Sequence, residues 1–131
     1  MNAKSITALK VEPRKGPTVV ELKNDLDSLQ KAVSEGCDRQ GLIEIIPIAE
    51  GVCILCNEEG KLLGLDGNRR IGNDIIVGTF YVIGENEEGE LISLTDKQIL
   101  FYNNMFAIPE SFTDDEIEAS FFFEVTDNWE V

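Results

Sequence analysis

The residues best suited to chemistry lie in a glycine-rich stretch between Asp66 and Asp74. It contains the only adjacent arginines of the chain, Arg69 and Arg70, preceded by Asn68. Guanidinium groups present planar sets of donors that match carboxylates and phosphates. We therefore predict that an Asn68-Arg69-Arg70 loop contacts an anionic ligand or an acidic partner surface. The alternative is a surface loop whose arginines pair with neighbouring acids of the same chain.

Little else in the sequence points to catalysis. The chain has no histidine, which removes the commonest general base, the usual serine and cysteine triads and every histidine-containing metal site. Cys53 and Cys56 have CxxC spacing but fall within an apolar run typical of a strand. Positions i and i+3 of a strand point to opposite faces, so we interpret both as buried structural cysteines. We expect no catalytic residue, no metal site and no cofactor, and hence a protein that is not an enzyme.

The tetrapeptide NEEG occurs twice, at residues 57–60 and 86–89. Each copy follows an apolar strand-like segment and precedes one that contains leucines. A type I turn with glycine in the left-handed region fits both copies. The similarity around them is too short for a repeat protein, and a duplication is the alternative. An EF-hand beginning at Asp66 fails, because Arg70 and Val77 stand where calcium ligands are needed.

Hydrophobic periodicity places these motifs on a hairpin-rich sheet. Strands are predicted at residues 6–11, 18–22, 42–48, 52–56, 61–65, 75–83 and 90–94. One helix is predicted from the N-cap Asn24 to Gly36, and a second from the capping box at Thr95 to about Phe106. Pro47 should lie at a sheet edge or a bulge, and Gly78 at a bulge or a close approach of two backbones.

These elements predict an α+β fold: a mostly antiparallel, hairpin-rich sheet with two main helices on one face and an acidic C-terminal extension. The 131 residues, 43% of them hydrophobic, suffice for one self-supporting core. We assign residues 1–106 to the α+β core domain. Residues 107–131 form an acidic, Phe-rich extension that packs on the core or on a partner. Within it, a capping box at Thr113 competes with strand alternation up to Val125, which we interpret as a helical turn leading into a strand.

The charge is unevenly distributed. The chain has a net charge of −14, and residues 85–131 carry one base, Lys97, against thirteen acids. Such a field repels nucleic acids and anionic membranes, so we expect neither as a direct partner. It could attract a basic partner or imitate a nucleic acid, and the plain alternative is a solvated acidic surface. Three cysteines and an N-terminus without a long apolar run predict a cytoplasmic protein with reduced thiols.

Three separated blocks also resemble one known family. They are LKVEPRKGPTVVELKNDLDSLQKAV, CNEEGKLLGLDGNRR and NDIIVGTFYVIGENEEGELISLTDKQI. Together they are similar to the bacterial and phage family called domain of unknown function 3846, over roughly residues 5–105. The resemblance implies a small cytoplasmic α+β domain without an established activity. Asn68 and Arg69 match a recurring asparagine–arginine pair of that family, which makes them the first choice for a functional contact.

We therefore predict a non-enzymatic binding or interaction protein of a bacterium or its mobile elements. Its Asn68-Arg69-Arg70 loop would contact a protein partner or a small anionic ligand. The alternative is an acidic nucleic-acid mimic that inhibits a DNA-binding enzyme through residues 85–131. A homodimer is compatible with the sequence, since Phe121, Phe122, Phe123 and Trp129 are apolar enough to form a dimer or partner surface.

Overall fold

The computed structural model describes residues 4–120 and confirms the α+β class with antiparallel sheets. The main sheet has the order β2-β1-β7-β4-β3, with β8 paired to β7, and β5-β6 form a second sheet. The strands are β1 (Ser5–Val11), β2 (Thr18–Lys23), β3 (Ile43–Ala49), β4 (Val52–Asn57), β5 (Gly67–Ile71), β6 (Asp74–Val77), β7 (Phe80–Glu85) and β8 (Leu91–Ile92). The helices are α1 (Leu26–Val33) and α2 (Asp96–Met105), and residues 114–120 form a further helix.

The hairpins form where the turn residues predict them. β1 pairs with β2 from Ser5–Lys23 to Lys10–Thr18, and β3 pairs with β4 around Gly51, whose φ is 77°. A residue that must adopt positive φ is best supplied by glycine, which has no Cβ. β3 is an edge strand, and its register shifts between Pro47 and Ala49. The expectation that Pro47 lies at an edge or bulge is confirmed.

The main sheet has a hydrophobic cluster on each face. On one face Val52, Ile54 and Cys56 of β4 pack in one cluster with Tyr102 and Phe106 of the α2 region. On the other face Cys53 and Leu55 pack in a second cluster, together with side chains from α1 and β7. Successive side chains of a strand alternate between faces, so one strand can serve both cores.

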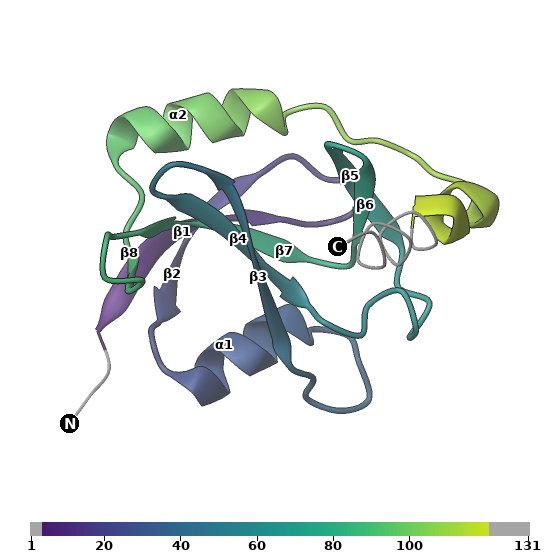
Figure 1. The fold of residues 1–131 in the computed structure, drawn as a ribbon, viewed down its shortest axis with the longest axis horizontal. Coiled ribbons are helices and arrows are strands. Elements are labelled where there is room, and N and C mark those ends of the chain that lie inside the picture. Colours follow the sequence, from purple (N-terminus) through teal and green to yellow (C-terminus); the bar gives the residue numbers. More distant parts are fainter. Residues whose placement is uncertain (1–3, 121–131) are drawn as a thin grey trace, which may run out of the picture.

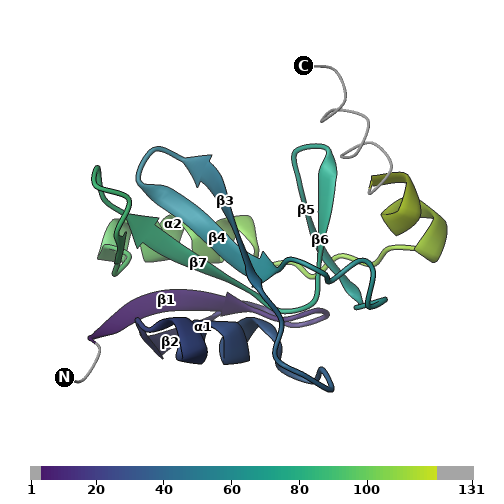
Figure 2. The same ribbon diagram turned by 60° about the horizontal axis from the view of Figure 1, so that its bottom comes forward.

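The two helices therefore lie on opposite faces of the sheet, one on each side in Figure 1. The prediction that both helices cover one face is wrong in this detail. α1 follows the β1–β2 hairpin and covers the second cluster, whereas α2 follows β8 and covers the first. The β5–β6 hairpin (Figure 2) is a second cover of the α2 face, because it adds Ile76 to the same cluster.

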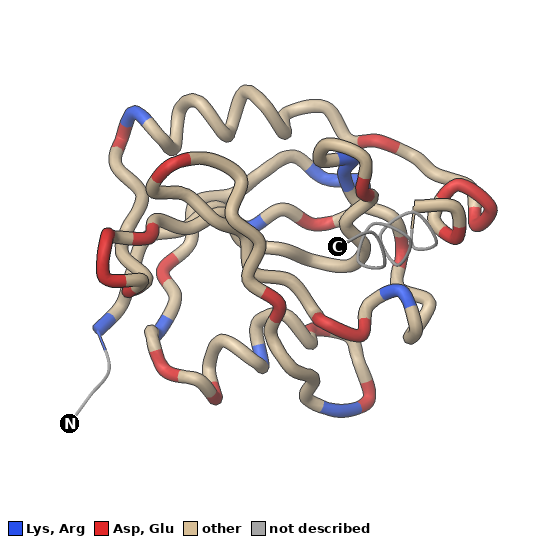
Figure 3. The backbone as a smooth tube through the Cα atoms, in the orientation of Figure 1, with Lys and Arg blue, Asp and Glu red and all other residues tan. Residues whose placement is uncertain are grey.

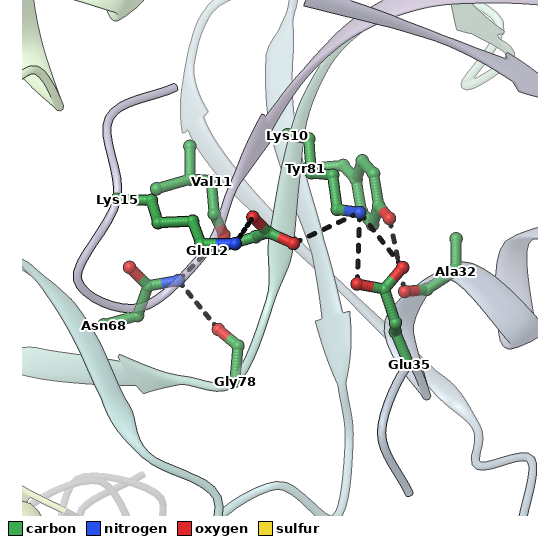
Figure 4. Close-up of polar contacts among 9 residues, drawn as sticks. All are labelled: Lys10, Val11, Glu12, Lys15, Ala32, Glu35, Asn68, Gly78 and Tyr81. Carbon is green, nitrogen blue, oxygen red and sulfur yellow. Dashed lines mark hydrogen bonds and ion pairs between the residues drawn. The ribbon is translucent and has the colours of Figure 1, made fainter. Parts of the chain in front are cut away.

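A set of polar contacts fixes α1 against the sheet. Lys10 of β1 donates to both carboxylate oxygens of Glu35, at 3.0 and 3.1 Å, just beyond the end of α1. The hydroxyl of Tyr81 donates to the carbonyl of Ala32 at 3.3 Å (Figure 4). Burial raises the pKa of the Tyr81 hydroxyl, so this donor stays protonated. These contacts join β1, β7 and α1 at one point.

The start of α1 differs by one residue from the expected boundary. Asp25, not Asn24, is the N-cap, and its carboxylate accepts a hydrogen bond from the backbone N–H of Ser28 at 2.7 Å. The amide of Asn24 instead donates to the carbonyl of Leu91 at 3.3 Å, between the hairpin and β8. Gly36 has a φ of 82°, the predicted left-handed conformation, but α1 already ends at Val33 with Ser34 as its C-cap.

Gly78 divides the segment that was predicted as one long strand. β6 ends at Val77 and β7 begins at Phe80, and the two strands belong to different sheets. Gly78 has a φ of 73°, and a Cβ on it would lie 2.7 Å from Cδ1 of Leu65. Its N–H donates to the carbonyl of Asp66 at 2.7 Å. The predicted close approach of backbone is confirmed, and it marks the corner between the sheets.

The C-terminal region begins with an extended segment and then turns into a helix. Thr113 caps residues 114–120: its hydroxyl accepts from the N–H of Glu116 at 3.1 Å, and its N–H donates to the Glu116 carboxylate at 2.9 Å. The capping box is confirmed, and the strand alternation predicted from Glu116 is wrong as far as Ser120. The expected strand to Val125, and the apolar surface of residues 121–123 and Trp129, lie outside the described residues.

Candidate functional site

The stretch predicted as an Asn68-Arg69-Arg70 loop is a β-hairpin. β5 and β6 pair antiparallel, with Ile71 opposite Asp74 and only two residues between them. Gly72, the first of the two, has a φ of 61°. A two-residue turn with glycine at positive φ is a common hairpin connection. The predicted loop is therefore corrected to a hairpin, in which Gly72 lies in the turn and Gly67 begins β5.

A bulge at Asn68 buries two consecutive polar side chains. Gly67 pairs with Val77 and Arg69 pairs with Ile76, so Asn68 is one extra residue in β5. Bulges disrupt the alternation of a strand and redirect its side chains. Asn68 and Arg69 are both fully buried, whereas Arg70 is exposed. Of the three residues predicted to contact a ligand, only Arg70 presents its side chain to solvent.

Asn68 joins three segments of the core. Its amide nitrogen donates to the carbonyl of Val11 and to the carbonyl of Gly78, both at 2.8 Å (Figure 4). Its amide oxygen accepts from the guanidinium of Arg69 at 2.7 Å. Buried polar groups are stabilising only when they are paired, and here donor and acceptor sides are both used. Asn68 thus holds the end of β1, the Gly78 corner and Arg69 together.

The guanidinium of Arg69 has a structural role as a clamp: it donates hydrogen bonds to oxygen atoms of three other residues. Its Nε and Nη2 donate to the carbonyl of Phe106 at 3.3 and 2.9 Å, and Nη2 also donates to the carbonyl of Lys15 at 2.6 Å. Nη1 donates to the carbonyl and the side-chain oxygen of Asn68. All five N–H groups of the arginine are therefore used. Burial lowers the pKa of Arg69, and the charge of Glu110 acts in the opposite direction.

This clamp explains how the end of α2 is positioned. Phe106 is the C-cap residue of α2, and the C-terminal end of a helix carries unpaired carbonyls and a partial negative charge. A cation at that end satisfies both features. Through Lys15 and Phe106, Arg69 connects the β1–β2 turn to the end of α2. All donors of the Arg69 side chain are used within the fold, so none remains for a ligand.

Arg70 lies at the surface beside the C-terminal region. Its guanidinium lies over the ring of Phe112, 5.7 Å from the centroid, and its backbone N–H donates to the Glu110 carboxylate at 3.3 Å. No ion pair to Arg70 is found within residues 4–120. It lines a hollow of about 270 Å³ with Asn73, Glu116, Ala119 and Ser120. Hydrogen bonds from Thr113 lower the pKa of Glu116, and the charge of Arg70 adds to this shift.

The cysteines are placed as the strand geometry predicts. Cys53 and Cys56 are buried on opposite faces of β4, in different hydrophobic clusters. Burial raises the pKa of the Cys53 thiol to about 11. A protonated, buried thiol is a poor nucleophile. Within residues 4–120 no three Cys, Asp or Glu side chains converge as metal ligands.

The two NEEG copies begin alike and end differently. In both, the asparagine side-chain oxygen accepts from the N–H two residues later, at 2.9 Å for Asn57 and 3.0 Å for Asn86. The second copy closes the β7–β8 hairpin with Gly89 at a φ of 79°. Gly60 does not have positive φ, and residues 58–64 continue as turns instead of the predicted strand at 61–65. Only the second copy is the expected turn with a left-handed glycine.

The surface that sequence reasoning missed is the outer side of α2. Leu100, Phe101, Met105 and the following Ile108 are 64%, 57%, 55% and 80% exposed. At about 100° per residue, the three helical positions span an arc of about 140° on the side away from Tyr102. The signal was present, because apolar residues at 99–102, 105 and 106 are too many for one helix face. We call these four side chains the α2 outer face.

Acidic residues gather at the two ends of α2 (Figure 3). One group lies in the β7–β8 turn, and Asp96 is in the first turn of the helix. The other group lies in residues 110–118, beyond the C-terminal end. Between the two groups the helix itself carries Lys97 near its start and no further charge to Met105. Lys97 lies near the N-terminal end, and Lys15 and Arg70 lie near the C-terminal end, so acids outnumber bases at each end of the apolar surface.

Comparison with known proteins identifies the family of this chain. Neither the curated proteins nor the solved structures gave a match. Among the helices of residues 4–120, none has the length and apolar character to cross a bilayer. The profile of the family described as a domain of unknown function matches residues 6–107, most of the described chain. The chain therefore belongs to the DUF3846 family.

Proposed function

We propose that this protein is a non-enzymatic interaction protein of a bacterium or its mobile elements, and that it binds a protein partner through the α2 outer face. The observation that carries the proposal is the helix with apolar side chains on both sides. Tyr102 and Phe106 fill the core, while Leu100, Phe101 and Met105 project into solvent. Contiguous exposed apolar surface on a small domain is typical of an interaction site.

The residue types of this face suit protein binding. Aromatic residues and methionine are enriched at the centres of protein interfaces, and each buries a large apolar area on contact. Full burial of a Leu, Phe or Met side chain is worth about 1.5–3 kcal/mol. Phe101 also contacts Tyr102 edge to face, with ring centroids 4.9 Å apart, which limits its freedom before binding. A partly fixed side chain loses less entropy when a partner covers it.

The use made of the buried and half-buried ionisable groups supports binding over catalysis. Arg69 holds the end of α2, and Lys10 with Tyr81 holds α1. Lys61 pairs with Asp74 and joins the turn after β4 to β6. Catalytic groups usually converge on one pocket with shifted pKa values. In this protein the ionisable groups lie at three separate contacts between secondary-structure elements.

A second candidate contact is a small anionic ligand at Arg70. The exposed guanidinium, held over Phe112, supports this part of the original hypothesis. Asn68 and Arg69 would contribute indirectly, by fixing the strand that carries Arg70. The negative charges of Glu110 and Glu116 nearby weaken the case for an anion. Replacing Arg70 with Ala should abolish such binding, measured by calorimetry with inorganic phosphate, and leave the fold intact.

Nucleic-acid mimicry requires acids in a continuous row with phosphate-like spacing. In residues 85–120 the acids form two groups separated by the length of α2 (Figure 3). The described residues therefore do not form the extended negative ridge that imitation of DNA would require. We therefore favour a protein partner over imitation of DNA.

Site-specific photo-crosslinking in host cells tests the proposal. A benzoyl-phenylalanine placed at Phe101 should capture a discrete protein, and the same group at Lys31 on the outer side of α1 should not. The signal should disappear when Leu100→Ser is added, because the apolar contact is lost. Identical crosslinking patterns from the two positions would contradict a docking role for the α2 outer face.

A further inference from the structure

Resting on the proposed function, we propose that the partner presents a basic amphipathic helix. Its apolar side chains would pack on the α2 outer face, and its lysines or arginines would face the acidic groups at the two ends of α2. The inference adds the chemical class of the partner to the contact surface. It is carried by the combination of an apolar face and an excess of acids over bases near its two ends, neither of which would suffice alone.

The shape of the surface fits a helix. From Leu100 to Met105 the apolar side chains of α2 span about 7.5 Å at the helical rise of 1.5 Å per residue, and Ile108 follows beyond the end of the helix. A partner helix of two to three turns would cover this length. A convex helix surface is best matched by side chains packed between its own, as when two helices lie 8–10 Å apart, axis to axis. Phe101 and Met105, one turn apart, form the ridge for such packing.

The charges select a basic partner. Asp96 and the acids of the β7–β8 turn lie toward the N-terminal end of α2, and those of residues 110–118 lie toward the C-terminal end (Figure 3). After Lys97 the sequence contains no basic residue. Charges within about 8 Å of a contact are only partly screened at physiological salt. Lys97, Lys15 and Arg70 also lie near these ends, but the acids outnumber them. A basic helix would therefore be attracted overall, whereas an acidic one would be repelled.

The same charges disfavour the other occupants. A second copy would bring another net charge of −14 against this surface, and an anionic membrane would be repelled in the same way. Residues 121–131 carry three acids and no base, so they are also a poor match for an acidic border. A partner of opposite charge removes each of these penalties.

The inference is tested with three fluorescein-labelled 18-residue peptides and the full chain, by fluorescence polarisation. One peptide has leucines along a helical face and lysines elsewhere, the second has the same composition scrambled, and the third has glutamates in place of the lysines. The leucine–lysine helix should bind at least tenfold more tightly than either of the others. Its dissociation constant should rise several-fold between 50 and 300 mM NaCl, because the border charges become screened.

Matched substitutions locate the binding. Leu100→Ser and Phe101→Ser should each weaken binding of the leucine–lysine helix about tenfold. Leu26→Ser should leave it unchanged, because Leu26 is an equally exposed leucine, 66% against 64%, on α1. Circular dichroism and thermal melts of the three variants should match those of the parent. Equal weakening by Leu26→Ser and Leu100→Ser would overturn the inference.

The other outcomes separate the partner class from the docking surface. Equal binding of the lysine and glutamate helices, lost in Phe101→Ser, would overturn the basic partner and leave the α2 outer face as a contact. Failure of all three peptides would overturn the inference, while crosslinking at Phe101 would still decide the proposed function. A dimer in light scattering that Leu100→Ser dissociates would identify a second copy. Tighter binding by a chain with serines at Phe121, Phe122 and Phe123 would identify residues 121–131 as the occupant.

Discussion

The two helices of this protein cover opposite faces of one sheet and treat their outer surfaces differently. α1 presents an ion pair to solvent, with Lys31 Nζ 2.9 Å from an Asp27 carboxylate oxygen, and a single exposed leucine beside it. α2 presents Leu100, Phe101 and Met105. Both helices bury apolar side chains against the sheet. The difference shows that core formation accounts for α1 and for only half of the apolar content of α2.

The largest effect on stability should distinguish the buried side of α2 from its exposed side. Phe106 is buried and contacts Phe80 edge to face at 5.4 Å. Phe106→Ala should lower the free energy of unfolding by about 3–5 kcal/mol. Phe101→Ala, on the outer face, should change it by less than about 0.5 kcal/mol. Urea titration followed by circular dichroism measures both, and similar losses would show that the outer face is also part of the core.

The next effect concerns the two adjacent arginines. Arg69→Met should cost about 3 kcal/mol, because the carbonyls of Lys15 and Phe106 lose their buried donor. Arg70→Met removes an exposed side chain and should cost less than about 0.5 kcal/mol. The comparison is made by urea unfolding of both variants. An equal cost would mean that burial of Arg69 does not distinguish the pair.

The corner between the sheets should give an intermediate effect. Gly78→Ala adds a Cβ at a positive φ and 2.7 Å from Leu65. The strain should cost about 1–3 kcal/mol. Since the β5–β6 hairpin covers the α2 face, hydrogen exchange should accelerate there and in α2 more than in α1. Uniform acceleration in both helices would contradict independent covers for the two faces.

The α1 face should respond to alkali through Cys53. Burial, with a smaller contribution from Glu85, raises the pKa of this thiol from 9.0 to about 11. Between these values the unfolded chain loses the proton and the folded chain keeps it, so stability falls as pH rises. A loss of about 2 kcal/mol is expected from pH 9 to 11. Cys53→Ala should flatten this part of the pH profile; an unchanged slope would assign it to other groups such as Tyr81.

The smallest effect should be on the outer side of α1. Lys31→Ala removes one exposed i,i+4 ion pair, worth about 0.3–0.5 kcal/mol at low salt. Thermal melts at 20 and 500 mM NaCl should show the difference shrinking with salt. A loss as large as that of Phe106→Ala would mean that this surface does more than meet solvent.

Local patterns predicted most of the elements. The capping box at Thr95, the Gly51 hairpin and the placement of Cys53 and Cys56 follow from turn, cap and strand geometry, which depend on neighbouring residues. The side on which each helix packs depends on the path of the chain across the sheet. No short pattern encodes that path, so the expectation of both helices on one face had no local support.

The candidate site was harder to predict for a physical reason. A buried arginine is usually expected to have a carboxylate partner, whereas Arg69 is neutralised by the dipoles of carbonyl groups from distant segments. Arg69 donates to the backbone carbonyls of Lys15 and Phe106, so the side chains of these two residues do not indicate the contact. The two-residue turn at Gly72 could have revealed the hairpin. The extra residue at Asn68 could not be recognised from alternation alone.

That extra residue adds a joint to β5 without deciding which arginine is buried. Arg69 lies opposite Ile76 and Arg70 opposite Ile75, and deleting Asn68 would leave both pairs in place. The deletion would instead remove the amide that joins Val11, Gly78 and Arg69. A related chain that is one residue shorter in β5 would therefore keep its buried arginine but would need another group to satisfy the two carbonyls.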